Sequence, residues 1–312
     1  MNFSDRFGVD ISGLGSPFEG VVVGRTLIMD GDSACYKVTT TAKKMDTAIR
    51  RFTTEIYEAM FLTKAESARV HLTPKGCFKN GRHLLLGAKP YQAQRSSVKP
   101  TLLEPLRLLA PSLFQPHEAI QVFAHYDIEA DDAVMMDSYS VENSIVWSED
   151  KDLNIVPSAR YCIRTGRTLL LTPGDRFGWV GTRKTEGGAV KSDGHGTKFF
   201  WLQMLMGDTA DNIKGIIKLD GKNCGEVSAL AALEHVSCEN HAANLVINGY
   251  RAIGQNPLPE AEALWLIRMR GDTAAGYIWS LDLTPLNRAF IQECFSRKYR
   301  MELDEYNEVQ EV

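Results

Sequence analysis

The sequence predicts an α/β protein with a twisted, largely parallel sheet, flanking helices and a helical C-terminal part. Two observations lead to this fold class. Between residues 120 and 171, short apolar runs alternate with helical patterns, as expected where helices connect parallel strands. Beyond residue 197 the apolar side chains recur only at helical spacing. With 312 residues, the chain is long enough for one large α/β domain or for a core domain with a smaller appendage.

Local patterns predict the elements in order. Residues 1–20 are irregular, and the first strand region covers 21–30. Residues 45–62 form an amphipathic helix, because their apolar side chains recur every three or four positions. The other elements expected before residue 172 are strands at 70–73, 120–125, 144–147, 161–163 and 168–171, and helices at 102–109, 130–139 and 151–156.

Proline and glycine set further boundaries. Pro111 is expected to end the helix at 102–109, because proline lacks the backbone N–H that a helix interior needs. The glycine-rich, polar stretch 173–196 is expected to be a long loop. Helices should then follow at 197–206, 224–233, 242–248, 259–269 and 287–298. The chain therefore divides near residue 197.

Charge is segregated along the chain, although the net charge is only −4. The window 67–103 contains seven Lys or Arg residues and no acid, whereas 127–152 contains nine acids and one base, Lys151. The tail 301–312 contains five acids and no base. This pattern predicts a cation-binding centre beside a surface that binds a polyanion. The sequence has neither a secretory signal nor a long apolar run, so we expect a cytoplasmic protein without membrane contact.

Carboxylates follow the ends of three predicted strands and of one later helix. Those of interest are Asp30, Glu129, Asp131, Asp132, Asp150, Asp152, Asp208 and Asp211. Because the carboxyl ends of parallel strands meet at one edge of a sheet, these side chains should converge. Clustered carboxylates need a counter-charge, and Mg²⁺ and Mn²⁺ prefer oxygen ligands. Two such ions roughly 4 Å apart can activate a water and stabilise the leaving oxygen of a phosphodiester. Each motif alone is also compatible with a helix cap.

A phosphatase is the alternative enzyme. The stretch DGDSA, residues 30–34, resembles the start of a haloacid-dehalogenase-type motif, with Asp30 as the nucleophile and Asp32 as the acid–base group. However, Ala34 stands where that motif has Thr or Val. The alternative also leaves the acids at 129–132 and 148–152 without a role.

Taken in order, the motifs resemble those of the flap endonuclease and 5′→3′ exonuclease family, which includes phage exonucleases and the N-terminal domain of bacterial DNA polymerase I. The matching stretches are EADD at 129–132, SEDKDL at 148–153, GDTADNIKGI at 207–216, LIMDGD at 27–32 and KPYQAQR at 89–95. The resemblance covers 27–233, about two-thirds of the chain.

The resemblance implies a PIN-like nuclease core at 21–196, with an arch or clamp at about 67–103. It further implies a helix–loop–helix at 197–250 that grips duplex DNA, with a possible K⁺ there, and a helical region with an acidic tail at 251–312. Two ions, Mg²⁺ or Mn²⁺, would be held by the family's ligands. In this sequence those are Asp30, Glu129, Asp131 and Asp132 for the first ion, and Asp150, Asp152, Asp208 and Asp211 for the second. Asp32 would only cap the following helix.

The implied activity is a metal-dependent 5′→3′ exodeoxyribonuclease and flap endonuclease in DNA replication. It would act as a monomer on DNA with 5′ ends or flaps, in the host cytoplasm if the protein is phage-encoded. The basic stretch at 67–103 would bind the DNA strand mainly through its phosphates. Residues expected to contact DNA are Arg82, Lys89, Tyr91, Arg95 and Lys222. The planar guanidinium of Arg95 is expected on the scissile phosphate.

Three departures from the family pattern motivate an alternative. Thr73 and Pro74 stand where the family has an aspartate, and Gln92 stands where it has a lysine. The Gly-Ile-Gly tip of the helix–loop–helix aligns to 218–220, which reads Lys-Leu-Asp. The alternative is a catalytically impaired protein of the same fold that binds branched DNA.

Overall fold

The computed structural model describes residues 20–96, 98–163, 166–169, 176–185 and 187–310. Its centre is a six-stranded sheet with the strand order β3-β2-β1-β4-β5-β6. The strands are β1 (Val22–Asp30), β2 (Ala65–Leu72), β3 (Ile120–Ala124), β4 (Ser144–Trp147), β5 (Ala159–Cys162) and β6 (Arg167–Leu169). The first five run parallel and β6 is antiparallel to β5. The predicted α/β class is therefore confirmed. The strands expected at 161–163 and 168–171 correspond to the antiparallel pair β5 and β6, and residues 170–171 lie outside the described residues.

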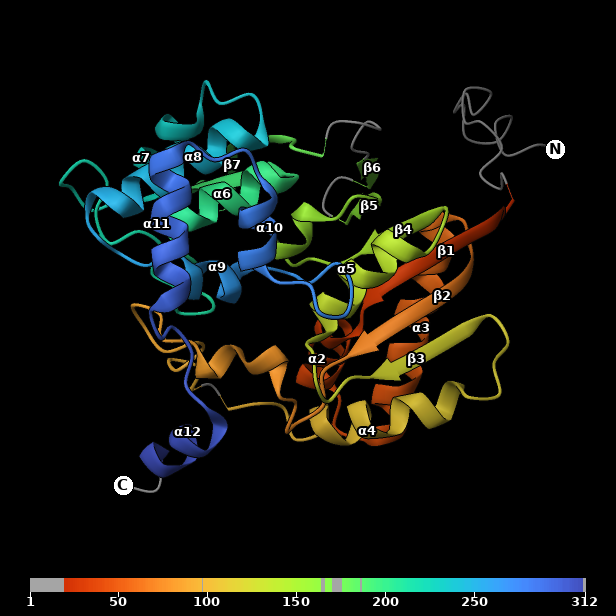
Figure 1. The fold of residues 1–312 in the computed structure, drawn as a ribbon. Coiled ribbons are helices and arrows are strands. Elements are labelled where there is room, and N and C mark those ends of the chain that lie inside the picture. The colour runs from red at the N-terminus through yellow and green to blue at the C-terminus, as the bar shows by residue number, and fades with distance from the viewer. Residues whose placement is uncertain (1–19, 97, 164–165, 170–175, 186, 311–312) are drawn as a thin grey trace, which may run out of the picture.

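Helices cover both faces of this sheet (Figure 1). Side chains alternate between the two faces along a strand, and β1 illustrates the consequence. Leu27 and Met29 pack with the helices α2 (Gly31–Thr41), α3 (Met45–Thr63) and α4 (Leu103–Phe114). Ile28 faces the other way and packs with α5 (Ala130–Ser140) and with the C-terminal helices.

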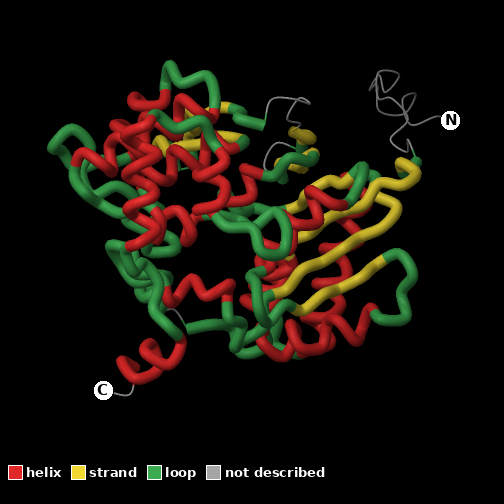
Figure 2. The backbone as a smooth tube through the Cα atoms, viewed as in Figure 1, coloured by secondary structure: helices red, strands yellow, loops and turns green. Residues whose placement is uncertain are grey.

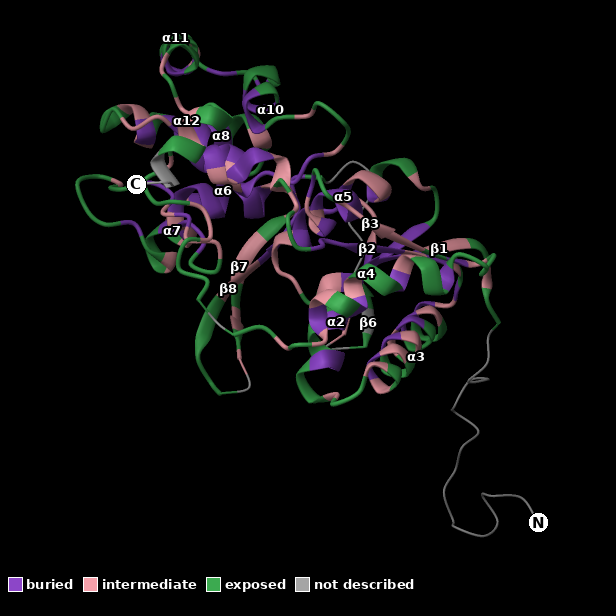
Figure 3. Cartoon of the chain, turned by 90° about the horizontal axis from the view of Figure 1, so that it is seen from below, coloured by how far each residue is buried: buried purple, intermediate pink, exposed green. Residues whose placement is uncertain are grey.

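The C-terminal part is helical, as predicted. Its helices are α6 (Thr197–Met206), α7 (Glu226–Leu233), α8 (Glu239–Ala252), α9 (Leu258–Leu264), α10 (Ala274–Ser280), α11 (Pro285–Ser296) and α12 (Leu303–Gln310). Helix α6 is buried from Lys198 to Leu205 and forms the centre of this part (Figure 3). One hydrophobic core joins it to the sheet, since Val146 of β4 belongs to the same cluster as Trp201 and Trp265. The division of the chain into domains stays a prediction.

Three local predictions were wrong. The segment 176–195 is not all loop, because β7 (Trp179–Lys184) and β8 (Val190–His195) form an antiparallel hairpin; residues 173–175 lie outside the described residues. Helix α4 continues through Pro111 to Phe114, because Ala110 and Phe114, four residues apart, are both buried against the sheet. The segment predicted as a helix at 151–156 is a short 3₁₀ turn, η2 (Asp152–Ile155).

The end of the chain returns to the basic stretch. Residues 299–301 run beside 84–86, through Leu86 N to Tyr299 O at 2.9 Å and Met301 N to Leu84 O at 2.8 Å. The ring of Tyr306 in α12 also meets His83 edge-on, with centroids 5.0 Å apart. Figure 2 shows this return at the C-terminal end, below the helical part. Within the described residues, we find no helix with the length and apolar character that a membrane span requires.

Candidate active site at the carboxyl edge of the sheet

The carboxyl ends of the parallel strands open into a cavity of about 340 Å³. Strand β1 lies between β2 and β4, so the chain order reverses at β1, which is where parallel sheets bind ligands. Eight carboxylates and seven cationic side chains line the cavity. The carboxylates are Asp30, Asp32, Glu104, Glu129, Asp131, Asp150, Asp152 and Asp211, and the cations are Lys75, Lys79, Arg82, Arg95, Lys99, Arg107 and Lys151.

Asp30 is placed by the turn from β1 into α2. Its carboxylate caps α2 by accepting from Asp32 N at 3.0 Å, and it also accepts from the hydroxyls of Ser33 and Ser148. Gly31 is needed between the two acids, because an added Cβ would lie 2.7 Å from Leu72 Cδ2 and 2.9 Å from a backbone oxygen of β2. The cap therefore belongs to Asp30, and the prediction that Asp32 caps this helix was wrong.

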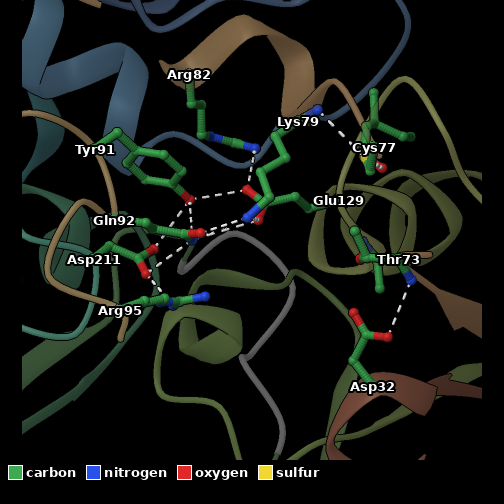
Figure 4. Close-up of polar contacts among 12 residues, drawn as sticks. Asp32, Thr73, Cys77, Lys79, Arg82, Tyr91, Gln92, Arg95, Glu129 and Asp211 are labelled. Atoms are coloured by element: carbon green, nitrogen blue, oxygen red, sulfur yellow. Dashed lines mark hydrogen bonds and ion pairs between the residues drawn. The ribbon is translucent and has the colours of Figure 1, made fainter. Parts of the chain in front are cut away.

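Asp32 instead reaches across to the end of β2. Its carboxylate accepts from Thr73 N at 3.0 Å and pairs with Arg107 Nε at 2.9 Å. Burial raises the pKa of Asp32 to about 6, against the opposing effect of Arg107. Thr73 in turn accepts from Ala130 N at 2.8 Å through its hydroxyl. The end of β2 carries no acid in the sequence, yet a carboxylate from α2 lies beside it in space (Figure 4).

Asp30, Asp131 and Asp150 form the most negative part of the cavity. Among the described residues, none of the three carboxylates has a Lys, Arg or His side chain at ion-pair distance. Burial raises the pKa of Asp131 well above its usual range, and the charges of Asp30 and Asp150 add to the effect. Burial also raises the pKa of Asp150, again with a contribution from Asp30. These side chains come from the ends of β1 and β4 and from the start of α5.

Asp152 and Asp208 share the ammonium group of Lys151. Lys151 Nζ pairs with Asp208 and lies 3.4 Å from Asp152 Oδ1. Gln203 Nε2 donates to Asp152 Oδ1 at 2.6 Å. Burial and the neighbouring Asp150 raise the pKa of Asp152 to about 7. Lys151 thus acts as an internal counter-ion at this end of the cavity.

The loop 207–215 brings Asp208 and Asp211 to the sheet. Asp208 N donates to Ile213 O at 2.8 Å, and Ile213 N donates to Asp208 O at 2.7 Å; these two hydrogen bonds close the loop. Gly207 and Gly215 have positive φ angles, and a Cβ on Gly207 would lie 2.3 Å from Ile213 O. Asp208 is buried behind the cavity, whereas Asp211 lines it and pairs with Arg95. The two glycines of GDTADNIKG are therefore required by close backbone contact.

Glu129 lies at the centre of a polar network from the basic stretch (Figure 4). Its Oε2 accepts from Tyr91 Oη at 2.9 Å and Arg82 Nη1 at 3.1 Å, while its Oε1 lies 3.3 Å from Lys79 Nζ. Gln92 Nε2 donates to Tyr91 Oη at 2.9 Å. Burial acts to raise the pKa of Glu129, but Arg82 and Lys79 hold it below its usual value.

Arg82 and Asp132 are paired away from solvent. Arg82 Nη1 and Nη2 donate to the two Asp132 oxygens at 2.6 and 2.7 Å, and Nη2 also donates to Trp265 O at 2.6 Å. Asp132 is fully buried, does not line the cavity, and accepts from Glu129 N and Ile267 N, each at 3.2 Å. Asp132 therefore lies outside the carboxylate cluster. Arg82 reaches the cavity wall with its Nη1 and Nη2 groups already engaged, and its contact with DNA stays a prediction.

Three predicted DNA-contacting residues remain to be placed. Lys89 and Lys222 are exposed on the surface, whereas Tyr91 is partly buried. Lys222 closes a two-residue turn with Leu219, bonded at 2.8 and 3.0 Å, in which Asp220 and Gly221 both have positive φ. A tight turn at Asp220-Gly221 is thus present between α6 and α7, although the Gly-Ile-Gly of the family pattern is missing. Tyr91 points its hydroxyl at Glu129 and Asp211, and its contact with DNA stays a prediction.

Sequence reasoning missed Lys79 and Arg107 as cavity residues. Lys79 is one of seven bases in the window 67–103, and nothing in that window distinguishes it from its neighbours. Arg107 lies on α4, and no motif includes it. Lys151, by contrast, stands out in the sequence as the single base among the nine acids of 127–152.

The donor chemistry of the cavity fits a divalent cation. Carboxylate oxygens are the ligands that Mg²⁺ and Mn²⁺ prefer, and the carboxylates of Asp30, Asp131 and Asp150 have no cationic partner among the residues that the structure describes. In the described part of the chain, no group of three or more His, Cys, Asp or Glu side chains is arranged to hold a metal ion as the side chains stand. The other carboxylates of the cavity are paired with Lys151, Arg95, Lys79, Arg82 and Arg107. The cluster of Asp30, Asp131 and Asp150 is accordingly the part of the cavity most in need of a cation.

Comparison with known proteins supports the fold. No protein-family model and no curated protein matches the sequence. A crystal structure of the T5 D15 protein, co-crystallised with metal ions, is similar with a TM-score of 0.50 and 15% identity, over 87% of this chain and 98% of that chain.

Two further T5 structures are similar at lower scores. A mutant T5 5′-exonuclease has a TM-score of 0.44 at 13% identity, over 87% of this chain and 98% of that chain. A bacteriophage T5 flap endonuclease in complex with DNA and metal ions has a TM-score of 0.43 at 15% identity, over 88% of this chain and all of that chain. The parallel sheet with helices on both faces and a helical C-terminal part is therefore the PIN-like fold of the bacteriophage T5 D15 protein.

Proposed function

We propose that the protein is a divalent-metal-dependent nuclease that hydrolyses DNA phosphodiesters, as a 5′→3′ exonuclease and 5′-flap endonuclease. One observation carries the proposal: Asp30, Asp131 and Asp150, which have no cationic partner among the described residues, lie where the strand order reverses at β1, beside the basic segment 67–103. The fold supports it, because a T5 protein of this fold was crystallised with metal ions. DNA with 5′ ends or flaps is the proposed substrate, and a monomer the proposed acting form.

The ligands proposed for the first ion are Asp30, Asp131 and Asp150. Asp152, Asp208 and Asp211 are proposed for a second ion, which would have to replace the contacts of Lys151 and Arg95. This set differs from the one that the family resemblance implies. Asp132 is left out, because Arg82 and backbone amides occupy its carboxylate. Glu129 is left out because it is engaged by Arg82, Lys79 and Tyr91, and Asp150 moves from the second ion to the first. When bound, the ions would supply an activated water and offset the charge of the phosphate. A K⁺ ion near the turn at Asp220-Gly221 is part of the same proposal.

The proposed reaction is the hydrolysis of a DNA phosphodiester, and water is its only other reactant. The oxygen of a water forms a bond to phosphorus, and the bond from phosphorus to the 3′ oxygen breaks. One water proton ends on the departing 3′ oxygen, and the other stays with the new 5′-phosphate until it ionises. The exposed guanidinium of Arg95 and the ammonium groups of Lys75 and Lys99 at the cavity are proposed to hold the phosphates.

The impaired DNA-binding protein remains the second candidate. The observation that favours it is that Asp208, Asp211 and Glu129 already pair with cationic side chains. A protein whose carboxylates are neutralised internally has less need of a metal. In that case the same surface would bind branched DNA without cleaving it.

Cleavage of an end-labelled 5′-flap duplex in Mg²⁺ or Mn²⁺ tests the proposal. We expect wild-type protein to cleave, EDTA to stop it, and Asp150→Asn to lose cleavage while binding DNA at least as tightly, because a negative charge is removed. Glu149→Gln is the matched control, since this exposed neighbour makes the same charge change outside the cavity. Binding without cleavage in both metals would favour the second candidate. Hydrolysis of a small phosphomonoester that survives in Asp150→Asn would instead support the phosphatase.

A further inference from the structure

We propose that Lys79 is a further phosphate-binding cation of the carboxylate cavity, beside those already proposed, and that Gln92 positions it. Gln92 occupies the place in KPYQAQR where a lysine is expected, and an amide cannot neutralise a phosphate. The structure brings an ammonium group to the same point from another part of the chain, because Lys79 Nζ donates to Gln92 Oε1. The inference rests on the proposed nuclease function and assigns one residue within it.

The contacts of Gln92 fix the direction of its amide. Its Nε2 donates to Tyr91 Oη at 2.9 Å and to Asp211 Oδ1 at 3.1 Å, so its Oε1 must face Lys79. Rotating the amide by half a turn would set an NH₂ group against the ammonium and an oxygen against a carboxylate. The amide therefore links Lys79 to the Tyr91 hydroxyl and to Asp211, with one end suited to each (Figure 4).

The backbone holds both residues in an unusual conformation. Lys79 and Gln92 each have a φ of 53°, in the left-handed region that residues other than glycine seldom occupy. Phe78 N and Asn80 N donate to Tyr126 O and Asp127 O, each at 2.7 Å, so the segment around Lys79 is tied to the chain that leads into Glu129. Gln92 N donates to Asp211 O at 2.9 Å. Strain that several contacts maintain is typical of functional sites.

Lys79 differs from the other cations in the cavity. Arg82 is buried, and its Nη1 and Nη2 groups hold four contacts, to Asp132, Glu129 and Trp265 O, so a phosphate could bind them only by breaking one of these contacts. The side chain of Lys79 is 30% exposed, and its ionic partner Glu129 lies 3.3 Å away. A lysine has three rotatable donors on a flexible stem. Lys79 can thus exchange Glu129 for a phosphate oxygen without leaving Gln92.

Exchange of the cation between positions 79 and 92 tests the inference. Lys79→Met removes the charge but keeps the length of the side chain. It should lower the single-turnover cleavage rate of the 5′-flap duplex by about 100-fold, as the loss of one charged donor commonly does. The KM should change by less than about threefold, because many other phosphate contacts remain. The double variant Lys79→Met/Gln92→Lys should regain at least about tenfold of the lost rate.

Gln92→Ala tests the positioning role of the amide. It should slow cleavage less than Lys79→Met does, and it should have little further effect in the Lys79→Met background, since Gln92 acts through the ammonium. Lys43→Met is the matched control, because Lys43 is exposed and does not line the cavity. Circular dichroism and the urea midpoint must show that each variant is folded.

The outcomes separate this inference from the proposed function. Wild-type cleavage together with an unchanged rate in Lys79→Met would overturn the role of Lys79 and leave the nuclease intact. A double variant as slow as Lys79→Met would overturn the equivalence of the two positions. A wild-type protein inert in Mg²⁺ and Mn²⁺ would reject the nuclease itself, whatever the variants do.

Discussion

Replacing Arg82 by methionine should destabilise the protein strongly while leaving its affinity for DNA phosphates unchanged. Arg82 is 2% exposed, and its guanidinium donates to Asp132, Glu129 and Trp265 O. Its removal leaves the fully buried carboxylate of Asp132 without a counter-ion. Loss of one partner of a buried ion pair costs about 3–5 kcal/mol. For a protein of this size, that is a fall in Tm of roughly 10 °C.

A second variant separates the lost ion pair from lost packing. Arg82→Met/Asp132→Leu removes both charges, so it should recover part of the loss. Recovery should be incomplete, because Trp265 O, Ile267 N and Glu129 N lose their partners as well. The assay is urea unfolding followed by tryptophan fluorescence, with binding of a 5′-flap duplex measured by anisotropy. A loss below about 1 kcal/mol in Arg82→Met, or a clear fall in DNA affinity of the folded variant, would refute the reasoning.

Three other variants test separate features. Gly31→Ala should cost about 1–3 kcal/mol, because the new methyl would overlap Leu72 and the backbone of β2; an unchanged urea midpoint contradicts this. Burial and the neighbouring His71 lower the pKa of His125 from the usual 6.5 to about 4. The neutral ring therefore contributes stability that is fully present above pH 6.5 and is lost as the pH falls through about 4. His125→Gln should reduce that acid-side loss by at most about 2 kcal/mol, since the ring is half-exposed, and urea midpoints between pH 4 and 7 that match wild type would disprove it. Arg95→Ala should lower both cleavage and DNA affinity, and an unchanged single-turnover rate would remove Arg95 from the site.

The parallel core could be predicted because its signals are local. The strands at 120–125 and 144–147 and the helices at 45–62 and 130–139 are close to the observed β3, β4, α3 and α5. The hairpin of β7 and β8 was missed because its six-residue strands carry glycines and charges and bury few side chains. Its polar sequence resembles that of a loop, and only pairing between the two strands distinguishes it.

The site was predictable in its location but not in its internal pairing. The ends of the predicted strands indicate where Asp30, Asp131 and Asp150 lie, because the carboxyl ends of parallel strands share one edge of the sheet. No sequence pattern predicts that Asp132 is buried against Arg82, because each residue lies among several others of the same charge. The contacts of Lys79 and of Asp32 join elements whose distance in space depends on the whole fold.

The return of the chain's last residues to the basic stretch bears on the order in which the protein is made. Arg82 donates to Trp265 O, 183 residues further along, and Ala88 N donates to Glu260, 172 residues further along. The pairing of 299–301 with 84–86 lies later still. Synthesis proceeds from the N-terminus, so the central sheet can be complete long before these partners leave the ribosome. The segment that carries Lys79 and Arg82 therefore gains these native supports only after residues 260–301 have been synthesised, and a protein shortened before residue 299 would keep its carboxylates but lack part of the frame around them.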